Sequence, residues 1–341
     1  GGWPVVPKGK YEKNTTAERV ITLRQRLVTE GYLPFDALSI DKPEAFDAEL
    51  ADALREFQRT HGVSPSGKVD ERTRAELNIS AEARLYTLRE NYPRISAYME
   101  GLGPRNILVN IPSAQLEAVE FGKVYSRHNV VVGKLERPTP TLASKVTDVV
   151  FNPHWTAPAS IVAKDLIPKY LKDPAVFDQM GIRIFDGLDG PEVDPATVDW
   201  SMTAPDRYVF RQDSGDENSL GTMKINFANK HMVYMHDTPH RELFSRNARF
   251  ESSGCVRVDQ VAKLVEWAFA GQNDVDEVQI EMITASQETY QVKVDQAPPD
   301  VRFMYLTAWA TEDGVVDFRP DIYQLDGTGF IYGQPEPVGG S

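Results

Sequence analysis

The chain has 341 residues, of which 41% are hydrophobic and 26% are charged, and its formal net charge is −13 at pH 7. This length is enough for two domains, and the composition is that of an ordinary globular chain. The negative charge argues against nucleic acid as a partner, and no apolar run reaches the roughly 18–20 residues of a membrane span, so no transmembrane segment is predicted.

The first part of the chain is predicted to be extended and then helical. Residues 1–14 contain Pro4 and Pro7, and because proline disfavours helix at and before its position, we expect an extended N-terminal segment. From Thr15 the apolar residues recur at helical spacing, and Glu18 stands at capping-box distance from Thr15. A three-helix domain is therefore expected over residues 15–80, with helices at 15–31, 47–61 and 71–77.

Two stretches of this domain resemble a known module. Ala53-Leu-Arg-Glu-Phe-Gln-Arg-Thr-His-Gly-Val63, followed by Gly67-Lys-Val-Asp-Glu-Arg-Thr73, is similar to the three-helix peptidoglycan-binding domain of bacterial wall enzymes. Ser64 to Asp70 departs from the middle of that family's pattern. The resemblance implies glycan strands as a partner. The alternative is a helical accessory unit that binds no glycan.

Residues 81–104 are predicted to form a linker helix. Leu85, Leu88 and Tyr92 recur at helical spacing, and Pro93 is expected to break the helix. Such a helix would join two domains and pack on one of them.

From Arg105 the apolar period changes from helical to strand-like, which predicts a mostly antiparallel β domain over residues 105–330. Residues 153–206 interrupt this pattern with a plausible helix at 161–171 and a Gly/Pro/Asp-rich stretch. An insertion of this length is typical of a lid or a binding loop, so we interpret it as a cap over a groove, with Trp155 near that groove. The alternative is a peripheral decoration.

The predicted fold class is α+β, because short strands dominate after residue 105 and helices dominate before it. Residues 331–341 are expected to be a disordered tail. Strands are predicted at 106–111, 115–121, 124–132, 147–151, 206–211, 278–283, 290–294, 302–310 and 318–323, with a helix at 259–270.

One short segment combines a histidine with the only cysteine of the chain. His236 directly follows the apolar run 231–235, and Cys255 follows Gly254. A thiol is a strong nucleophile only as thiolate, and a nearby imidazole assists its deprotonation. Glycine before the nucleophile lets backbone N–H groups approach a developing oxyanion. The alternative is a structural cysteine, since lone cysteines often serve as small buried apolar residues.

The segment resembles the signature of L,D-transpeptidases, the YkuD family. The resemblance consists of His236, a spacer from Asp237 to Glu251, and then Ser252-Ser-Gly-Cys-Val-Arg257. Ser253 stands where the family usually has a second histidine, and Arg257 where it usually has asparagine. The form is similar to long Gram-negative members that have a capping subdomain.

The resemblance implies a cysteine acyltransferase of the bacterial envelope. Cys255 would attack the bond before the terminal D-Ala of a peptidoglycan tetrapeptide stem, with His236 as base. The acyl group of the resulting thioester would then be transferred to a diaminopimelate amine, giving a 3–3 cross-link. The backbone N–H groups of Ser253, Gly254 and Cys255 would hold the oxyanion. Carbapenem-type compounds would inhibit the enzyme.

Five further residues are candidates for substrate binding. Arg257 is suited to a stem carboxylate, with a structural salt bridge as the alternative. Tyr234 would share a strand face with His236. The partner that orients His236 is expected to be a backbone carbonyl, because the side chain of Asp237 points to the opposite face. The substrate-binding candidates are Tyr234, Arg257, Ser252, Trp155 and Lys224, and Asn218 and Gly221 are weaker ones.

Other functions stay open at this point. The six histidines show no His-x-His or HExxH spacing, which argues against a zinc peptidase, so no metal or cofactor is expected. An L,D-carboxypeptidase or another cysteine hydrolase would share the acyl-enzyme and use water as acceptor. A wall-binding scaffold without catalysis is a further alternative. The start at Gly1-Gly2 suggests a trimmed periplasmic form, with any signal segment absent from this sequence.

Overall fold

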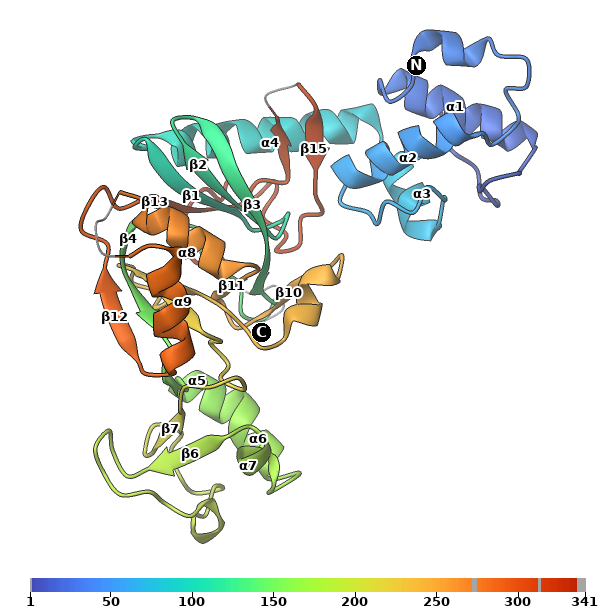
Figure 1. Cartoon of the computed structure of the whole chain (residues 1–341). Helices are drawn as coiled ribbons and strands as arrows, with labels where there is room; N and C mark the ends of the chain where they lie inside the picture. Colours follow the sequence, from blue (N-terminus) through green and yellow to red (C-terminus); the bar gives the residue numbers. More distant parts are fainter. Residues whose placement is uncertain (1, 272–274, 312–313, 336–341) are drawn as a thin grey trace. The chain divides into compact units, whose positions relative to one another are not determined.

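The computed structural model describes residues 2–271, 275–311 and 314–335, and all that follows concerns these residues. The chain divides into two compact units. The first contains residues 1–100 and 305–331, and the second contains residues 101–304 and 332–341. Residues 305–330, which we expected in the catalytic domain, thus lie in the first unit. Figure 1 shows the elements of both units.

The three predicted helices of the first unit are present as α1 (Glu18–Thr29), α2 (Ala48–Thr60) and α3 (Glu71–Leu77), with a 3-10 turn η1 (Phe35–Leu38). Asp47 and Asp70 cap α2 and α3, because their side chains accept the N–H of the residue three positions later. The expected capping box at Thr15 is wrong. Thr16 forms a β-bridge with Ala45, so α1 begins after Ala17, which has no side-chain cap.

The core of the three-helix part contains apolar residues from all three helices, and the extended N-terminal segment adds two buried side chains, Val6 and Tyr11. Leu23, Leu27 and Leu54 are fully buried there. The segment before α1 is therefore part of the folded domain.

Helix α4 (Ala81–Met99) corrects two expectations. It runs through Pro93 without a break. Pro93 is on the exposed side, where water can satisfy the carbonyl that loses its partner. The expected apolar face is also wrong, since Leu85, Leu88 and Tyr92 are exposed. The buried residues of α4 are instead polar or amphipathic: Arg84, Asn91, Arg94 and Tyr98.

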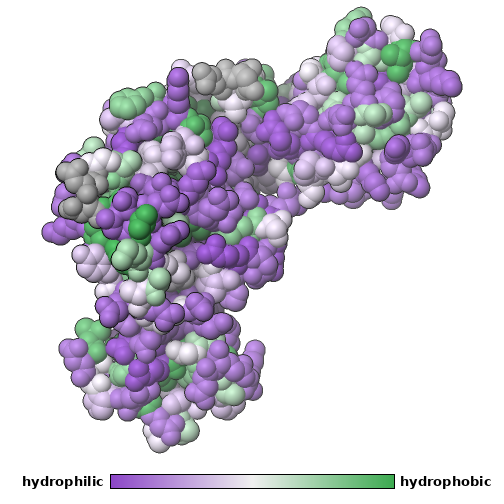
Figure 2. All heavy atoms as spheres, viewed as in Figure 1, coloured by the Kyte–Doolittle hydropathy of each residue, from purple (hydrophilic) through white to green (hydrophobic). Residues whose placement is uncertain are grey.

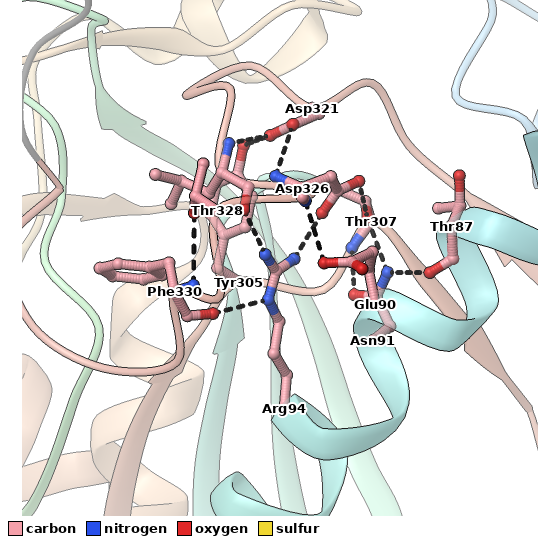
Figure 3. Close-up of polar contacts among 12 residues, drawn as sticks. Thr87, Glu90, Asn91, Arg94, Tyr305, Thr307, Asp321, Asp326, Thr328 and Phe330 are labelled. Atoms are coloured by element: carbon pink, nitrogen blue, oxygen red, sulfur yellow. Dashed lines mark hydrogen bonds and ion pairs between the residues drawn. The ribbon is translucent and has the colours of Figure 1, made fainter.

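The polar face of α4 holds residues 305–331, as Figure 3 shows. The Asn91 amide donates to Thr307 Oγ1 at 2.7 Å and accepts from the Thr307 N–H at 2.9 Å. Arg94 pairs with Asp326 at 2.6 Å and donates to two backbone carbonyls, those of Leu325 and Phe330. This segment also contains the hairpin of β14 (Ala308–Ala310) and β15 (Val316–Phe318).

The second unit is built on one long sheet with the strand order β10-β3-β11-β9-β8-β4-β13-β1-β2, and an additional β2–β3 pairing joins the end of this path back to β3. Most pairings are antiparallel, as predicted; β1–β13, β3–β10 and β9–β11 are parallel. The strands are β1 (Arg105–Asn110), β2 (Gln115–Glu120), β3 (Lys123–Gly133), β4 (Leu142–Phe151), β8 (Met223–Phe227), β9 (Met235–His236), β10 (Phe250–Ser252), β11 (Val256–Val258), β12 (Tyr290–Lys293) and β13 (Asp300–Met304).

Two helices accompany this sheet. Helix α8 (Val261–Phe269) corresponds to the helix predicted at 259–270 and begins after Gln260; it buries Leu264, Val265 and Ala268. Helix α9 (Glu277–Ser286) stands where a strand was predicted. Val278 to Ile283 alternates like a strand, but Asp276 and Gln279 form a reciprocal capping box that begins a helix instead.

The predicted cap is a small subdomain within the second unit. Its sheet has the order β5-β7-β6, formed by β5 (Trp155–Thr156), β6 (Ile182–Phe185) and β7 (Val209–Gln212). The predicted helix at 161–171 is present as α5 (Ala159–Ile161), a π turn η2 (Val162–Leu166) and α6 (Ile167–Tyr170), followed by α7 (Val176–Gln179) and η3 (Pro195–Thr197). A separate core that includes Phe177, Trp200 and Phe210 holds it together.

On the face shown in Figure 2 most residues are hydrophilic, and hydrophobic ones appear in small separate groups. Within the described part of the chain, no helix has the length and apolar character needed to cross a membrane. Of the predicted tail, residues 336–341 lie outside the described residues.

Candidate active site

The register of three neighbouring strands brings the predicted residues to one face of the sheet. His236 is paired with Lys224 of β8 on one side and with Arg257 of β11 on the other. Residues in register, and residues two apart on one strand, point to the same face. Tyr234 and Cys255 directly precede β9 and β11, two positions before His236 and Arg257, and the Val256 N–H donates to the Tyr234 carbonyl at 3.0 Å. All five side chains therefore share one face.

Cys255 is half-buried and is the free cysteine of this face. Burial raises the pKa of its thiol. Hydrogen bonds from Tyr234 and the positive charges of Lys224 and Arg257 act in the opposite direction but do not outweigh burial. At neutral pH the resting sulfur is therefore a thiol.

His236 is held as a neutral base. Its side chain is buried, and burial, followed by the charge of Arg257, lowers its pKa to about 3. Its Nδ1 lies 2.5 Å from the backbone carbonyl of Asp237. A carbonyl can only accept, so Nδ1 carries the proton and Nε2 is the basic nitrogen. The orienting partner is thus a backbone carbonyl, as expected, whereas the Asp237 carboxylate accepts from Thr222.

The loop before Cys255 is fixed by internal hydrogen bonds. Ser252 Oγ donates to the Cys255 carbonyl at 2.5 Å and accepts from the Gly254 N–H at 3.2 Å. Gly254 has φ +114, a conformation that a side chain rarely adopts. Two expectations change here. Ser252 is buried and holds the loop rather than facing a substrate, and the Gly254 N–H is already occupied, so it is not free to hold an oxyanion.

The loop after β3 contributes two residues that sequence reasoning missed. Arg137 donates to Ser253 Oγ at 2.8 Å and pairs through both terminal nitrogens with Asp165 of the cap. Thr139 Oγ1 donates to the Gly254 carbonyl at 2.9 Å. Nothing in the spacing of Arg137 or Thr139 from Cys255 marks them in the sequence. Arg137 therefore links the cap directly to the loop before Cys255.

Arg257 is a half-buried cation for which the described residues provide no ion-pair partner. Among the ion pairs between described residues none involves Arg257, and its buried Nε has no hydrogen-bond partner there. Burial lowers the pKa of its guanidinium, while the negative charges of Glu251, Cys255 and Glu242 act against that shift. The alternative of a structural salt bridge is therefore not what the described residues show. A guanidinium two residues from Cys255 that has no ion-pair partner among the described residues suits an anionic ligand group.

The remaining candidates divide into two groups. Lys224 Nζ lies 4.3 Å from the centroid of the Tyr234 ring, and Tyr234 packs against the core of the cap, which includes Trp155. Trp155 of the cap thus reaches the site through Tyr234. Asn218 and Gly221 are structural. The Asn218 amide donates to two backbone carbonyls, and a Cβ at Gly221 would lie 2.5 Å from the Asp237 carboxylate.

Two family models match the chain. The model described as "L,D-transpeptidase catalytic domain" (YkuD) matches residues 104–280, and one described as "Putative peptidoglycan binding domain" matches residues 16–77. The first match contains all five residues of the common face. The second covers the three helices of the first unit.

A curated protein from Haemophilus influenzae, named "Putative L,D-transpeptidase", is 38% identical over 228 residues, which is 64% of this chain and 44% of that protein. The chain thus spans less than half the length of this relative.

Solved structures give a weaker likeness. An L,D-transpeptidase (Yku) from Stackebrandtia nassauensis is 12% identical with a TM-score of 0.31, and the match covers 88% of this chain and 96% of that one. L,D-transpeptidase 3 from Mycobacterium tuberculosis in complex with a faropenem-derived adduct is 12% identical with a TM-score of 0.26, over 46% of this chain and 52% of that one. The catalytic-domain model matches more than half of the sequence, and on that match the chain belongs to the YkuD family of L,D-transpeptidase catalytic domains.

Proposed function

We propose that this protein is a cysteine acyltransferase that cleaves the L,D bond before the terminal D-Ala of peptidoglycan tetrapeptide stems and transfers the acyl group to an amine. The observation that carries the proposal is the strand register that aligns Lys224, His236 and Arg257 across β8, β9 and β11 and places Cys255 two residues before Arg257. Acyl transfer by a cysteine requires a thiol and a base with an unprotonated nitrogen, and the two cations on the same face can stabilise negative charge.

In the first half-reaction the Cys255 sulfur attacks the carbonyl carbon of the L,D bond. His236 Nε2 takes the thiol proton as the C–S bond forms, so the reactive thiolate exists only during attack. The backbone N–H groups of Cys255 and Ser253 are the proposed oxyanion donors, since that of Gly254 is occupied by Ser252. The C–N bond then breaks, and the imidazolium returns the proton to the departing D-Ala amine, leaving a thioester.

In the second half-reaction an amine attacks the thioester. His236 accepts a proton from the attacking amine and returns it to the sulfur, which restores the thiol. A diaminopimelate side chain on another stem is the proposed acceptor, which gives a 3–3 cross-link. Water as acceptor would make the protein an L,D-carboxypeptidase.

The two cations on the face have separate proposed roles. Lys224 is close enough to Cys255 for their charges to interact, so it stabilises the thiolate as it forms. Arg257 has no internal partner among the described residues and is proposed to bind a stem carboxylate. Tyr234 and Trp155 are proposed to line the groove.

The proposed setting is the bacterial envelope, with the periplasm as compartment. The match of residues 16–77 to a peptidoglycan-binding model supports glycan strands as a second partner. The proposed domain division is 15–80 for wall binding, 81–104 as linker, and a catalytic domain from 105 with its cap at 153–206.

The proposal is tested by acylation with a carbapenem, whose strained lactam carbonyl acylates a nucleophile without losing atoms. Intact-mass spectrometry is expected to show the wild-type protein heavier by one drug mass and Cys255→Ala unchanged. A wild-type protein that stays at its own mass, while its circular dichroism shows it folded, would contradict acyl transfer at Cys255. Incubation with tetrapeptide stems and a D-amino acid then separates exchange of the terminal residue from hydrolysis.

A further inference from the structure

The hydroxyl of Thr139 contacts the loop before Cys255 and takes no part in the proton transfers proposed above. Thr139 is fully buried. Its Oγ1 accepts the N–H of Gly133 at 2.8 Å and donates to the carbonyl of Gly254 at 2.9 Å. A hydroxyl has one proton to donate, and here that proton is directed at the Gly254 carbonyl. The Thr139 side chain therefore ties this carbonyl to the loop that follows β3.

The Gly254 carbonyl and the Cys255 N–H belong to the same peptide unit. This peptide bond is trans, and because a peptide unit is planar, its C=O and N–H point in opposite directions. With the carbonyl held on Thr139, the Cys255 N–H points away from Thr139. No described residue accepts a hydrogen bond from that N–H. It is one of the two proposed oxyanion donors, so its direction matters for the reaction.

The peptide units on either side of this one are held in another way. The Gly254 N–H donates to Ser252 Oγ, and the Cys255 carbonyl accepts from the same hydroxyl. For the Gly254–Cys255 unit, the bond from Thr139 is the only hydrogen bond among the described residues. Gly254 has no Cβ to oppose other backbone conformations, so rotation of this unit costs little when the bond is absent.

A rotated Gly254–Cys255 unit would disfavour acyl transfer for an electrostatic reason. It would turn the carbonyl oxygen toward the place where negative charge develops and turn the N–H donor away from it. Ionisation of the thiol would not change in the same way. The pKa of Cys255 is governed by burial and by Tyr234, Lys224 and Arg257.

We propose that Thr139 is a positioning residue that keeps the Cys255 N–H aimed at the oxyanion. It acts through the Gly254 carbonyl and touches neither the substrate nor the sulfur. The inference rests on the proposed acyl transfer and adds to it the group that holds one oxyanion donor in place.

The test compares two reactions of the same sulfur in the full chain. Acylation by a carbapenem passes through an oxyanion, whereas alkylation by iodoacetamide displaces iodide from a saturated carbon and forms none. Thr139→Val keeps the branched shape and removes the hydroxyl. Losing one oxyanion donor slows acyl transfer about a hundredfold or more, and a peptide unit that rotates only part of the time loses less, so acylation is expected to slow about ten- to a hundredfold. The alkylation rate at the same pH should be unchanged.

Three further variants complete the comparison. Thr139→Ser keeps the hydroxyl and should restore most of the acylation rate. Thr141→Val is the matched control, because Thr141 is a buried threonine of the same segment whose hydroxyl accepts from the Gly333 N–H at 2.8 Å instead of holding Gly254. It should be acylated like the wild type. If thermal unfolding shows that Thr139→Val does not fold, Thr139→Ala removes the same hydroxyl and takes its place.

Three outcomes would overturn the proposal: equal acylation of Thr139→Val and the wild type, an equal slowing of acylation and alkylation, and no recovery in Thr139→Ser. Equal slowing of both reactions would mean that the hydroxyl holds the sulfur rather than the N–H. A wild-type protein that no carbapenem acylates is a different result, since it would overturn the acyl transfer itself and this proposal with it.

Discussion

At the scale of single residues, the site rests on a thiol and an imidazole that are both neutral before reaction. Burial raises the pKa of Cys255 and lowers that of His236, so no ion pair forms between them in the resting state at neutral pH. Because a protonated thiol is a weak nucleophile, this arrangement limits side reactions of the resting sulfur.

The reactivity of Cys255 is expected to follow this arrangement. Because its folded-state pKa is raised, the thiolate fraction is small at pH 7 and grows as pH rises. The rate of alkylation by iodoacetamide should therefore increase steadily from pH 6 to pH 9, with no plateau. As the chain has one cysteine, the incorporated mass reports this site alone.

Two comparisons sharpen that measurement. In urea the Cys255 thiol of the unfolded chain should ionise at lower pH, because burial no longer opposes its ionisation. Lys224→Met should move the folded profile to higher pH, since Lys224 lowers the thiol pKa. An alkylation rate that does not change between pH 5 and pH 7 would show that Cys255 and His236 form an ion pair at rest, which would contradict this account.

Arg257→Met is expected to weaken stem-peptide turnover without weakening the fold. Losing a charge-assisted hydrogen bond should reduce kcat/KM by about ten- to a hundredfold, mainly through KM, with partial rescue by Arg257→Lys. Thermal unfolding should show an unchanged or raised Tm, because the variant removes a half-buried charge that has no described partner.

Arg246→Met is the matched control for Arg257→Met, because it removes an exposed cation paired with Glu251. If Arg257→Met lowered Tm and left KM unchanged, Arg257 would be structural.

At the scale of elements, the Arg137 side chain joins the cap to the loop before Cys255. Arg137 comes from the loop after β3, Asp165 from the π turn of the cap, and Ser253 from the loop before β11. The position of the cap helix and the conformation of the Cys255 loop are therefore coupled through a single guanidinium.

Breaking this link should slow acylation of Cys255. Arg137→Met, Asp165→Ala and the double variant should all show the same reduced acylation rate, because each removes the same connection. Arg183→Met is the control, since it breaks an exposed ion pair of the cap with Glu192. Additive losses in the double variant would mean that the two residues act separately.

At the scale of the whole molecule, the first unit is assembled from two segments that are far apart in sequence. Residues 305–331 pack on α4 through Asn91 and Arg94 after the chain has passed through residues 101–304 of the second unit. The first unit is therefore complete only when the C-terminal segment is present.

Arg94→Met is expected to loosen this assembly. Arg94 is 1% exposed, and its removal leaves the Asp326 carboxylate without its ion-pair partner, which costs about 3–5 kcal/mol. Hydrogen exchange should accelerate in peptides from α4 and from residues 305–331. Arg89→Met, an exposed arginine of the same helix, should leave exchange unchanged. Equal protection in the two variants would contradict the role given to Arg94.

The sequence by itself determined the elements whose signals are local. The helices capped by Asp47 and Asp70, the strands from Arg105 to Phe151, and the His236–Cys255 segment all depend on residues within a few positions of one another. These signals need no partner from a distant part of the chain. Where two local signals competed, as at Asp276 to Ile283, alternation suggested a strand and the capping box produced a helix.

Tertiary structure alone decided which residues meet. Arg94 finds Asp326, Arg137 finds Asp165, and Ser252 turns inward to hold its own loop rather than outward to a substrate. The reason is physical. A side chain's partner across a sheet or along a helix is set by register and packing between segments far apart in sequence, and neither leaves a pattern in the neighbouring residues.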